Sequence, residues 1–235
     1  MTFDVTTSVL SRVDGSAELS VGTTKVITSV TGPIEPKIRQ ELPNLASLEI
    51  IVRPSLGVST TREKALEDKL RSILQSIIIR YKYPRQLIQI VVQFLITENN
   101  INDNGSNQHN KDFTLTELNA AINCCYFALI DANIALYNSF SSTSISIPLD
   151  TKKENYIFNP NMNDLIVSES HHVICFSIKD RKAANLLLLE SHGKFSEDQL
   201  LLAIRKAGDE CESIHNTYQR KCIANKVEND FIWKS

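Results

Sequence analysis

The stretch from Arg12 to Pro36 reads RVDGSAELSVGTTKVITSVTGPIEP. Its segment from Thr24 to Thr31 is rich in β-branched residues and ends at a glycine, a pattern typical of a strand. Residues 46–52 (ASLEIIV) show the same pattern and precede a proline. The N-terminal part of the chain is therefore predicted to be built mainly of strands.

Three motifs in this stretch resemble the RNase PH family. They are the Arg-x-Asp-Gly turn at Arg12, the Gly-Thr-Thr-Lys-Val strand start at Gly22 and the Gly-Pro-x-Glu-Pro close at Gly32. That family uses phosphate to shorten RNA from its 3′ end. The resemblance extends to about Cys222 and implies the RNase PH fold, of the ribosomal protein S5 domain 2-like class. We therefore expect an α+β chain in which two similar halves of strands and helices form one domain over residues 1–235.

One amphipathic helix is predicted over residues 62–81. Thr60 and Glu63 form a capping box at its start, and Pro84 prevents it from continuing. Residues 86–97 (QLIQIVVQFLIT) then indicate a long buried strand. The apolar positions of the helix recur at steps of three and four, the signature of one buried stripe, and are Leu66, Leu70, Ile73, Leu74, Ile77, Ile78 and Tyr81.

The polar tract 98–112 divides the chain. It is rich in asparagine and too poor in apolar residues to bury a surface, so we expect a mobile loop. It separates a first half of about 1–97 from a second half of 113–235.

The second half is predicted to alternate helices and strands. Thr114 with Glu117, and Ser196 with Gln199, repeat the capping-box pattern. The expected helices begin at these boxes, and the second runs over residues 197–222 with Leu200, Leu201, Ile204, Cys211, Ile214 and Tyr218 inward. Strands are expected at 143–149, 172–178 and 184–191, followed by a turn at His192, Gly193 and Lys194.

Composition places the chain among ordinary globular proteins. Charged residues make up 22% and the formal net charge is −2, so any contact with RNA must be local. The five cysteines include no C-x-x-C pair, which favours reduced thiols used as small apolar residues. No cationic leader and no apolar run of about 18 residues occur. We expect a protein of the nucleus, nucleolus and cytoplasm with no membrane partner.

Phosphorolysis needs an anion cradle for the attacking phosphate and carboxylates that hold a divalent metal. Active members of the family carry a Gly-Gly-Thr/Ser-Arg turn just before the second helix. Here that position holds residues 112–115 (DFTL), with one nearby glycine, Gly105, and no arginine between Arg85 and Arg181. Lys111 offers a point charge without the planar grip of a guanidinium.

The acidic cluster of active members should fall in or just after residues 141–149, which contain no carboxylate. Asp150 and Glu154 flank two lysines that would repel a metal ion. His171 and His172 are consecutive, so on a strand they point to opposite faces and cannot share a metal. Gly193 and Gly208 belong to no phosphate loop. The sequence predicts a catalytically silent chain with no catalytic residue, metal site or cofactor.

The segment from Arg53 to Arg85 carries eight basic residues against three acidic ones. Such local charge can hold a phosphate backbone without reading sequence. The candidates for RNA contact are Arg53, Arg62, Lys64, Lys69, Arg71 and Arg85. The first three are favoured, because they lie at the entry to a helix. The alternative is a solvated polar face, in which Glu67 and Arg71 form an i,i+4 pair.

Family members that lack these motifs resemble ring subunits of the eukaryotic RNA exosome, and the stretches 32–43 and 49–64 look like the fungal form of a small ring subunit. The resemblance implies a structural subunit that lines an RNA channel and supports ribosomal RNA maturation and messenger RNA turnover. Its implied partners are other RNase PH-like ring subunits, S1/KH cap subunits and a hydrolytic exoribonuclease. Two alternatives stay open: an active phosphate-dependent 3′-to-5′ exoribonuclease acting alone or as a homo-oligomer, and an interaction module in another assembly. Obligate assembly also predicts that the isolated chain self-associates.

Overall fold

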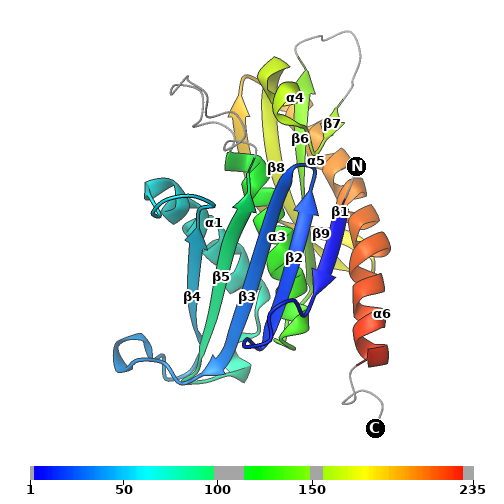
Figure 1. Cartoon of the computed structure of the whole chain (residues 1–235). Helices are drawn as coiled ribbons and strands as arrows, with labels where there is room; N and C mark the ends of the chain where they lie inside the picture. Colours follow the sequence, from blue (N-terminus) through cyan, green and yellow to red (C-terminus); the bar gives the residue numbers. More distant parts are fainter. Residues whose placement is uncertain (1–2, 98–113, 149–155, 230–235) are drawn as a thin grey trace.

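The computed structural model describes residues 3–97, 114–148 and 156–229 (Figure 1). The strands are β1 Phe3–Thr7, β2 Gly15–Val21, β3 Thr24–Ile34, β4 Ser47–Arg53, β5 Leu87–Ile96, β6 Ser139–Pro148, β7 Ile157–Phe158, β8 Ser168–Lys179 and β9 Lys182–Gly193. The helices are α1 Thr61–Ile77, α3 Thr114–Asp131, α4 Met162–Val167, α5 Glu197–Ile214 and α6 Arg220–Asn229, with short turns η1 Ile38–Gln40, η2 Arg80–Lys82 and η3 His215–Gln219.

The strands form two sheets, and the helices pack between and outside them. The first sheet has the order β1-β2-β3-β5-β4. Strands β4 and β5 are parallel, and the other neighbouring pairs of this sheet are antiparallel. The second is antiparallel in the order β7-β6-β8-β9. Helix α3 contacts both sheets, α1 packs against β4, and α5 covers the other face of the second sheet (Figure 1). The expected α+β class is confirmed.

The Arg-x-Asp-Gly motif joins β2 to its neighbours. A Cβ on Gly15 would lie 2.3 Å from the backbone nitrogen of Ala132, so only glycine lets β2 approach the end of α3 this closely. The carboxylate of Asp14 accepts a hydrogen bond of 2.8 Å from the amide of Gly32, the first residue of the Gly-Pro-x-Glu-Pro motif. These motif residues therefore hold the architecture together.

One apolar core extends from the first sheet through α1 and α3 to β8, and a second, smaller cluster lies under α5. Four cysteines are buried in these two clusters as free thiols, as predicted, and Cys222 is half-buried. Burial raises the pKa of Cys124 to about 12, which keeps this thiol protonated.

Helix α1 ends at Ile77, four residues before the expected end at Tyr81. The chain leaves the helix at Ile78 because this residue forms an isolated β-bridge with Leu136. The η2 turn follows, and Tyr81 is 58% exposed instead of buried. A contact between segments far apart in the sequence thus overrides the local helical pattern.

The C-terminal helix differs from the prediction in length and in its buried face. It runs as α5, the π-helical turn η3 and α6 to Asn229, past the expected end at Cys222. Leu201, expected inward, is 57% exposed. Cys211 and Ile214 are buried as predicted, and the other buried residues are Ala203, Ala207 and Gly208. Small side chains let α5 lie close to β6 and β8, and the leucine-rich face is left outside.

Other boundaries shift by a few residues. Strand β6 begins at Ser139, four residues before the expected start, and β9 continues through the expected turn residues His192 and Gly193. Short elements β1, β7 and α4 were not predicted. The capping boxes at Thr60 and Ser196 are confirmed. The side chain at residue 114, on which the third expected box depends, lies outside the described residues, and so do the tracts 98–113 and 149–155. Among the described helices, none has the length and apolar character needed to cross a membrane.

Candidate nucleic-acid interface

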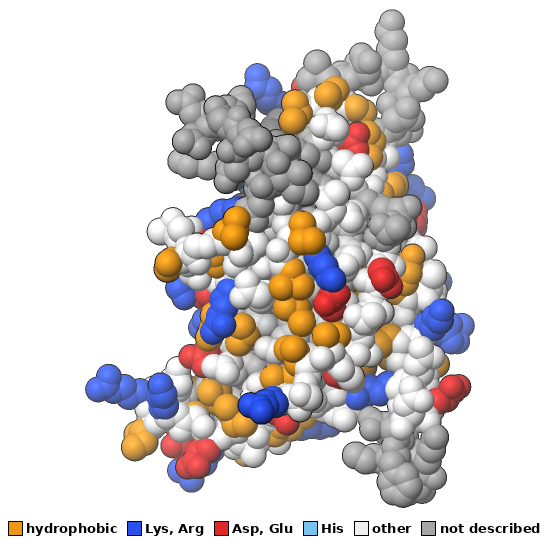
Figure 2. Space-filling model, viewed as in Figure 1, with side chains coloured by type: hydrophobic (Ala, Val, Ile, Leu, Met, Phe, Trp, Pro, Cys, Tyr) orange, Lys and Arg blue, Asp and Glu red, His pale blue; other side chains and the backbone are white. Residues whose placement is uncertain are grey.

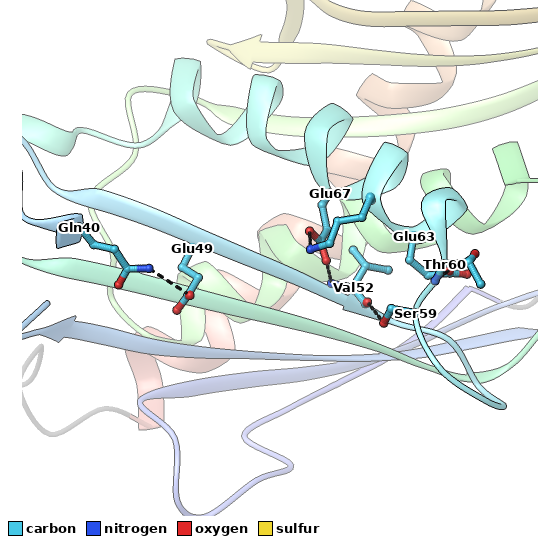
Figure 3. A network of polar contacts seen from close by, with 8 residues as sticks. Gln40, Glu49, Val52, Ser59, Thr60, Glu63 and Glu67 are labelled. Atoms are coloured by element: carbon cyan, nitrogen blue, oxygen red, sulfur yellow. Dashed lines mark hydrogen bonds and ion pairs between the residues drawn. The ribbon is translucent and has the colours of Figure 1, made fainter. Parts of the chain in front are cut away.

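The turn between β4 and α1 carries the favoured basic residues. Arg53 ends β4 and is exposed, and α1 begins eight residues later. The helix start is rigid, because the amide of Thr60 donates a 2.6 Å hydrogen bond to Glu63 (Figure 3), and the amide of Arg62 donates one of 3.3 Å to the Thr60 hydroxyl. The preceding loop exposes Leu56 and Val58. This turn, residues 53–64, is called the α1 entrance below.

Arg62 is held by a carboxylate from another helix. Its Nη2 lies 2.6 Å from Oε2 of Glu117 in the first turn of α3, and Glu117 is buried. A hollow of about 220 Å³ beside this pair is lined by Glu63 as well as by Arg62 and Glu117. With two carboxylates against one guanidinium, the hollow cannot act as an anion cradle.

Lys64 pairs with Glu67 at 2.6 Å, yet its side chain is 69% exposed. Glu67 also accepts a 3.0 Å hydrogen bond from the backbone amide of Val52, so it fixes α1 to the edge of β4 (Figure 3). The expected pair of Glu67 with Arg71 is wrong, since Lys64 is the ion-pair partner. A phosphate can therefore reach the outer side of the Lys64 ammonium group.

Glu63 adds fixed negative charge at the same turn. Burial opposes its ionisation, but the hydrogen bonds from Thr60 and the charge of Arg62 outweigh burial and lower the pKa of the carboxyl group below its ordinary value. Glu63 therefore stays ionised near neutral pH, and the net positive charge available to a ligand comes mainly from Arg53 and Lys64.

The remaining three candidates lie elsewhere. Lys69 pairs with Glu190 of β9 at 2.7 Å. Arg71 lines a separate hollow beside the start of β4. Arg85 pairs with Glu41 at 3.0 Å, just before β5.

The six candidates therefore do not form one patch. Arg53 is in register with Gln93 of β5, eight residues after Arg85, which places the two arginines about 25 Å apart along the sheet. Only Arg53, Arg62 and Lys64 share one short segment, the α1 entrance.

Strand β6 covers most of the segment where active family members are expected to carry the acidic cluster. It faces α3 through neutral polar groups. The hydroxyl of Ser142 donates a 2.7 Å hydrogen bond to Asn119, and the amide group of Asn123 donates one of 2.9 Å to the Ser142 carbonyl. Asn119 in turn donates a 2.8 Å hydrogen bond to Asn159. In residues 3–97, 114–148 and 156–229, no three His, Cys, Asp or Glu side chains are grouped as a metal site.

The two consecutive histidines have different surroundings. His172 is fully buried, and its ring lies 2.8 Å from the Ser191 hydroxyl and 3.2 Å from that of Ser170. Burial and the neighbouring His171 lower the pKa of His172 to about 4, so it is neutral at pH 7. The ring of His171 instead stacks on that of His192, with centroids 5.6 Å apart.

The sequence did not reveal the carboxylates that pair with the basic residues. Glu117 is 55 residues from Arg62, and Glu190 is 121 residues from Lys69. Glu117 was interpreted as part of a helix cap, and no local signal marks Glu190.

Comparison with known proteins places this geometry in a family. Residues 2–135 match the RNase PH model, described as the 3′ exoribonuclease family, domain 1. The exosome complex component RRP46 of Saccharomyces cerevisiae is 44% identical over 214 residues, covering 90% of this chain and 91% of the relative. The exosome complex component rrp46 of Schizosaccharomyces pombe is 32% identical and covers 94% and 90%.

A solved structure shows the same fold. The crystal structure of rice (Oryza sativa) Rrp46 superposes with a TM-score of 0.79 at 25% sequence identity, covering 95% of this chain and 94% of the rice chain. The motifs around Gly15 and Gly32, the two sheets and the family match all agree, and the chain belongs to the RNase PH family of 3′ exoribonuclease-type proteins.

Proposed function

We propose that this chain is a non-catalytic ring subunit of the RNA exosome. The observation that carries the proposal is the 44% identity to the yeast exosome component over nine-tenths of both chains. The ring is built with other RNase PH-like subunits, and S1/KH cap subunits and a hydrolytic exoribonuclease complete the particle. In this role the chain supports ribosomal RNA maturation and messenger RNA turnover in the nucleus, nucleolus and cytoplasm.

Two observations support catalytic silence. The described polar groups between α3 and β6 include neutral amides and hydroxyls bonded to one another, and the described residues of β6 include no carboxylate that could hold a divalent metal against a phosphate. In addition, residues 112–115 (DFTL) stand where active members carry the Gly-Gly-x-Arg turn.

A phosphorolysis assay tests this silence. The purified chain is incubated with single-stranded RNA, inorganic phosphate and Mg²⁺, and nucleoside diphosphates are measured. We expect none above a no-enzyme control. Phosphate-dependent release would instead establish the alternative, an active 3′-to-5′ exoribonuclease working alone or as a homo-oligomer.

Assembly is tested by affinity purification of the tagged chain followed by mass spectrometry. Recovery of other RNase PH-like and S1/KH proteins is expected. Their absence would favour an interaction module in another assembly.

The outer face of the first sheet also suggests assembly. Hydrophobic side chains follow the middle of this face (Figure 2). Because side chains alternate across a strand, Ile27, Ile51, Val91 and Leu95 share it. We therefore expect the isolated chain to self-associate at micromolar concentration, as measured by light scattering.

The α1 entrance is the proposed RNA contact. In the assembled ring, the double substitution Arg53→Gln with Lys64→Gln should weaken binding of single-stranded RNA and reduce the salt dependence of log K by about 1 to 2. The control is Arg205→Gln on the exposed face of α5. Equal salt dependence for both variants would place the RNA elsewhere.

A further inference from the structure

A hollow of about 320 Å³ opens beside the start of β4, at the opposite end of the strand from the α1 entrance. Its polar lining comes from four elements. Helix α1 supplies Arg71 and Gln75, the η2 turn supplies Arg80, and Gln40 and Glu49 come from η1 and β4. This cavity is called the β4 hollow below.

The two arginines of the β4 hollow have no ion-pair partner among the described residues. The Nε of Arg71 is shielded from solvent and makes no hydrogen bond with any described residue. Arg80 donates a 2.8 Å hydrogen bond from its Nε to the carbonyl of Ala46, which orients its guanidinium group. Two half-buried cations that line one hollow favour the binding of an anionic group.

Glu49 is the only carboxylate that lines the β4 hollow, and its oxygens bond to other groups. Oε1 accepts a hydrogen bond of 3.3 Å from Gln40 (Figure 3), and Oε2 accepts one of 2.7 Å from Gln89. Glu49 forms no ion pair with either arginine. The hollow therefore keeps an excess of positive charge that this carboxylate does not neutralise.

The hollow borders an open sheet edge, since β4 is the last strand of its sheet. At this edge Ala46 donates to the carbonyl of Arg80 (3.0 Å) and Val52 donates to Glu67 (3.0 Å). Alternate residues of a parallel strand direct their backbone groups to the same side. Leu48 and Ile50 therefore point their amides and carbonyls away from β5, between two positions that already have partners. Of the two, Leu48 lines the hollow, whereas Ile50 is only 2% exposed.

Apolar side chains beside the hollow favour a protein ligand over RNA. Leu42 lines the hollow and is 40% exposed, and Ile38 in the adjacent η1 turn is 92% exposed. An open strand edge can pair with the backbone of an extended peptide, whereas a polyanion would meet Glu49 and these apolar groups. The combination fits a peptide that carries one carboxylate.

We propose that the β4 hollow binds an aspartate or glutamate side chain on an extended segment of a neighbouring RNase PH-like ring subunit. The identity of this partner rests on the proposed function. Arg71 grips the carboxylate through the planar, two-pronged geometry of its guanidinium group, and Arg80 adds a second charge. The segment lies beside the start of β4, where Leu48 offers backbone hydrogen bonds.

The first test measures assembly. The chain is co-expressed with the other RNase PH-like ring subunits of its organism, and the affinity of each pair is measured for wild type, Arg71→Gln and the control Arg205→Gln. Arg71→Gln should weaken one pair by about tenfold or more, because one partner of a charge pair across the interface is removed. Arg205→Gln should assemble like wild type.

The second test detects the carboxylate directly. In the variant Arg71→Lys, a water-soluble carbodiimide couples the new amine to a carboxylate within reach, forming an amide bond while the carbodiimide is converted to a urea. Mass spectrometry of the complex should find position 71 linked to an aspartate or glutamate of one ring neighbour. A link to Glu49 alone would overturn the proposal, because it would mean that the charge is neutralised within the chain.

Further outcomes separate this inference from the proposed function. Normal assembly of Arg71→Gln would reject the inference alone. Normal assembly with weakened RNA binding would identify a phosphate as the ligand and also reject it. Failure of the wild-type chain to pair with any ring subunit would reject the proposed function, and the inference with it.

Discussion

Two arginines of helix α1, Arg62 and Arg71, lie in different surroundings. Arg62, in the first turn, is held 2.6 Å from the buried Glu117 of α3. Arg71, nine residues later, lies in the β4 hollow and makes no ion pair with any described residue. The difference shows that a basic residue in the sequence is a cross-link where the fold supplies a carboxylate, and a candidate for ligand binding where it does not.

Removing the carboxylate at the α1 entrance should have the largest effect. In Glu117→Gln the Arg62 guanidinium, one-third exposed, loses its counter-charge. We expect the free energy of unfolding to fall by about 2 kcal/mol, less than for a fully buried pair because solvent screens the charge. Urea unfolding at low micromolar concentration measures it, and Arg62→Gln with Glu117→Gln should recover part of the loss. A change below about 0.5 kcal/mol would show that the pair is not a structural cross-link.

Acid should weaken the α1 entrance through Glu63. The folded state lowers the pKa of this carboxyl group below 4.5, so its contribution is complete above about pH 4.5 and is lost as the pH falls through the lowered folded value. We expect Glu63→Ala to cost about 1 kcal/mol at pH 6 and clearly less at pH 3. Urea unfolding of the wild type and the variant at each pH measures the difference in their free energies of unfolding. Because both proteins contain His172, its titration contributes equally to both and cancels. A cost independent of pH would contradict the prediction.

The middle of α1 should show a smaller effect. Lys69 and Glu190 are about one-quarter exposed and join α1 to β9. Lys69→Met should reduce the free energy of unfolding by about 0.5 kcal/mol, the range of partly exposed ion pairs. Coupling with Glu190→Gln in a double-mutant cycle isolates the pair, and zero coupling would mean that the contact contributes nothing to stability.

The smallest effect is expected at the β4 hollow. Arg71→Gln in the isolated chain should change the free energy of unfolding by less than about 0.5 kcal/mol, because no intramolecular ion pair is lost. Thermal and urea unfolding both measure it. A loss above about 1 kcal/mol would assign Arg71 a structural role and remove the contrast between Arg62 and Arg71.

Local features were predictable because they depend on neighbouring residues. The capping boxes at Thr60 and Ser196 and the strands after Thr24, Ser47 and Leu87 were predicted from patterns a few residues long. The end of α1 was not, because Ile78 leaves the helix to bridge Leu136. The ion-pair partner of Glu67 was also predicted wrongly. This carboxylate accepts a hydrogen bond from the backbone amide of Val52 on a neighbouring strand and pairs with Lys64 instead of Arg71.

By itself, the sequence determined the family and the main elements, because glycine at positions 15 and 32 and the β-branched run between them constrain the backbone directly. It also located a cluster of positive charge between Arg53 and Arg85. Only the tertiary structure decided which of those charges stay available, because ion pairs form across 55 to 121 residues of chain and their energy depends on the burial of both partners. Arg62 was thereby bound within the fold, and Arg71 was left facing a hollow.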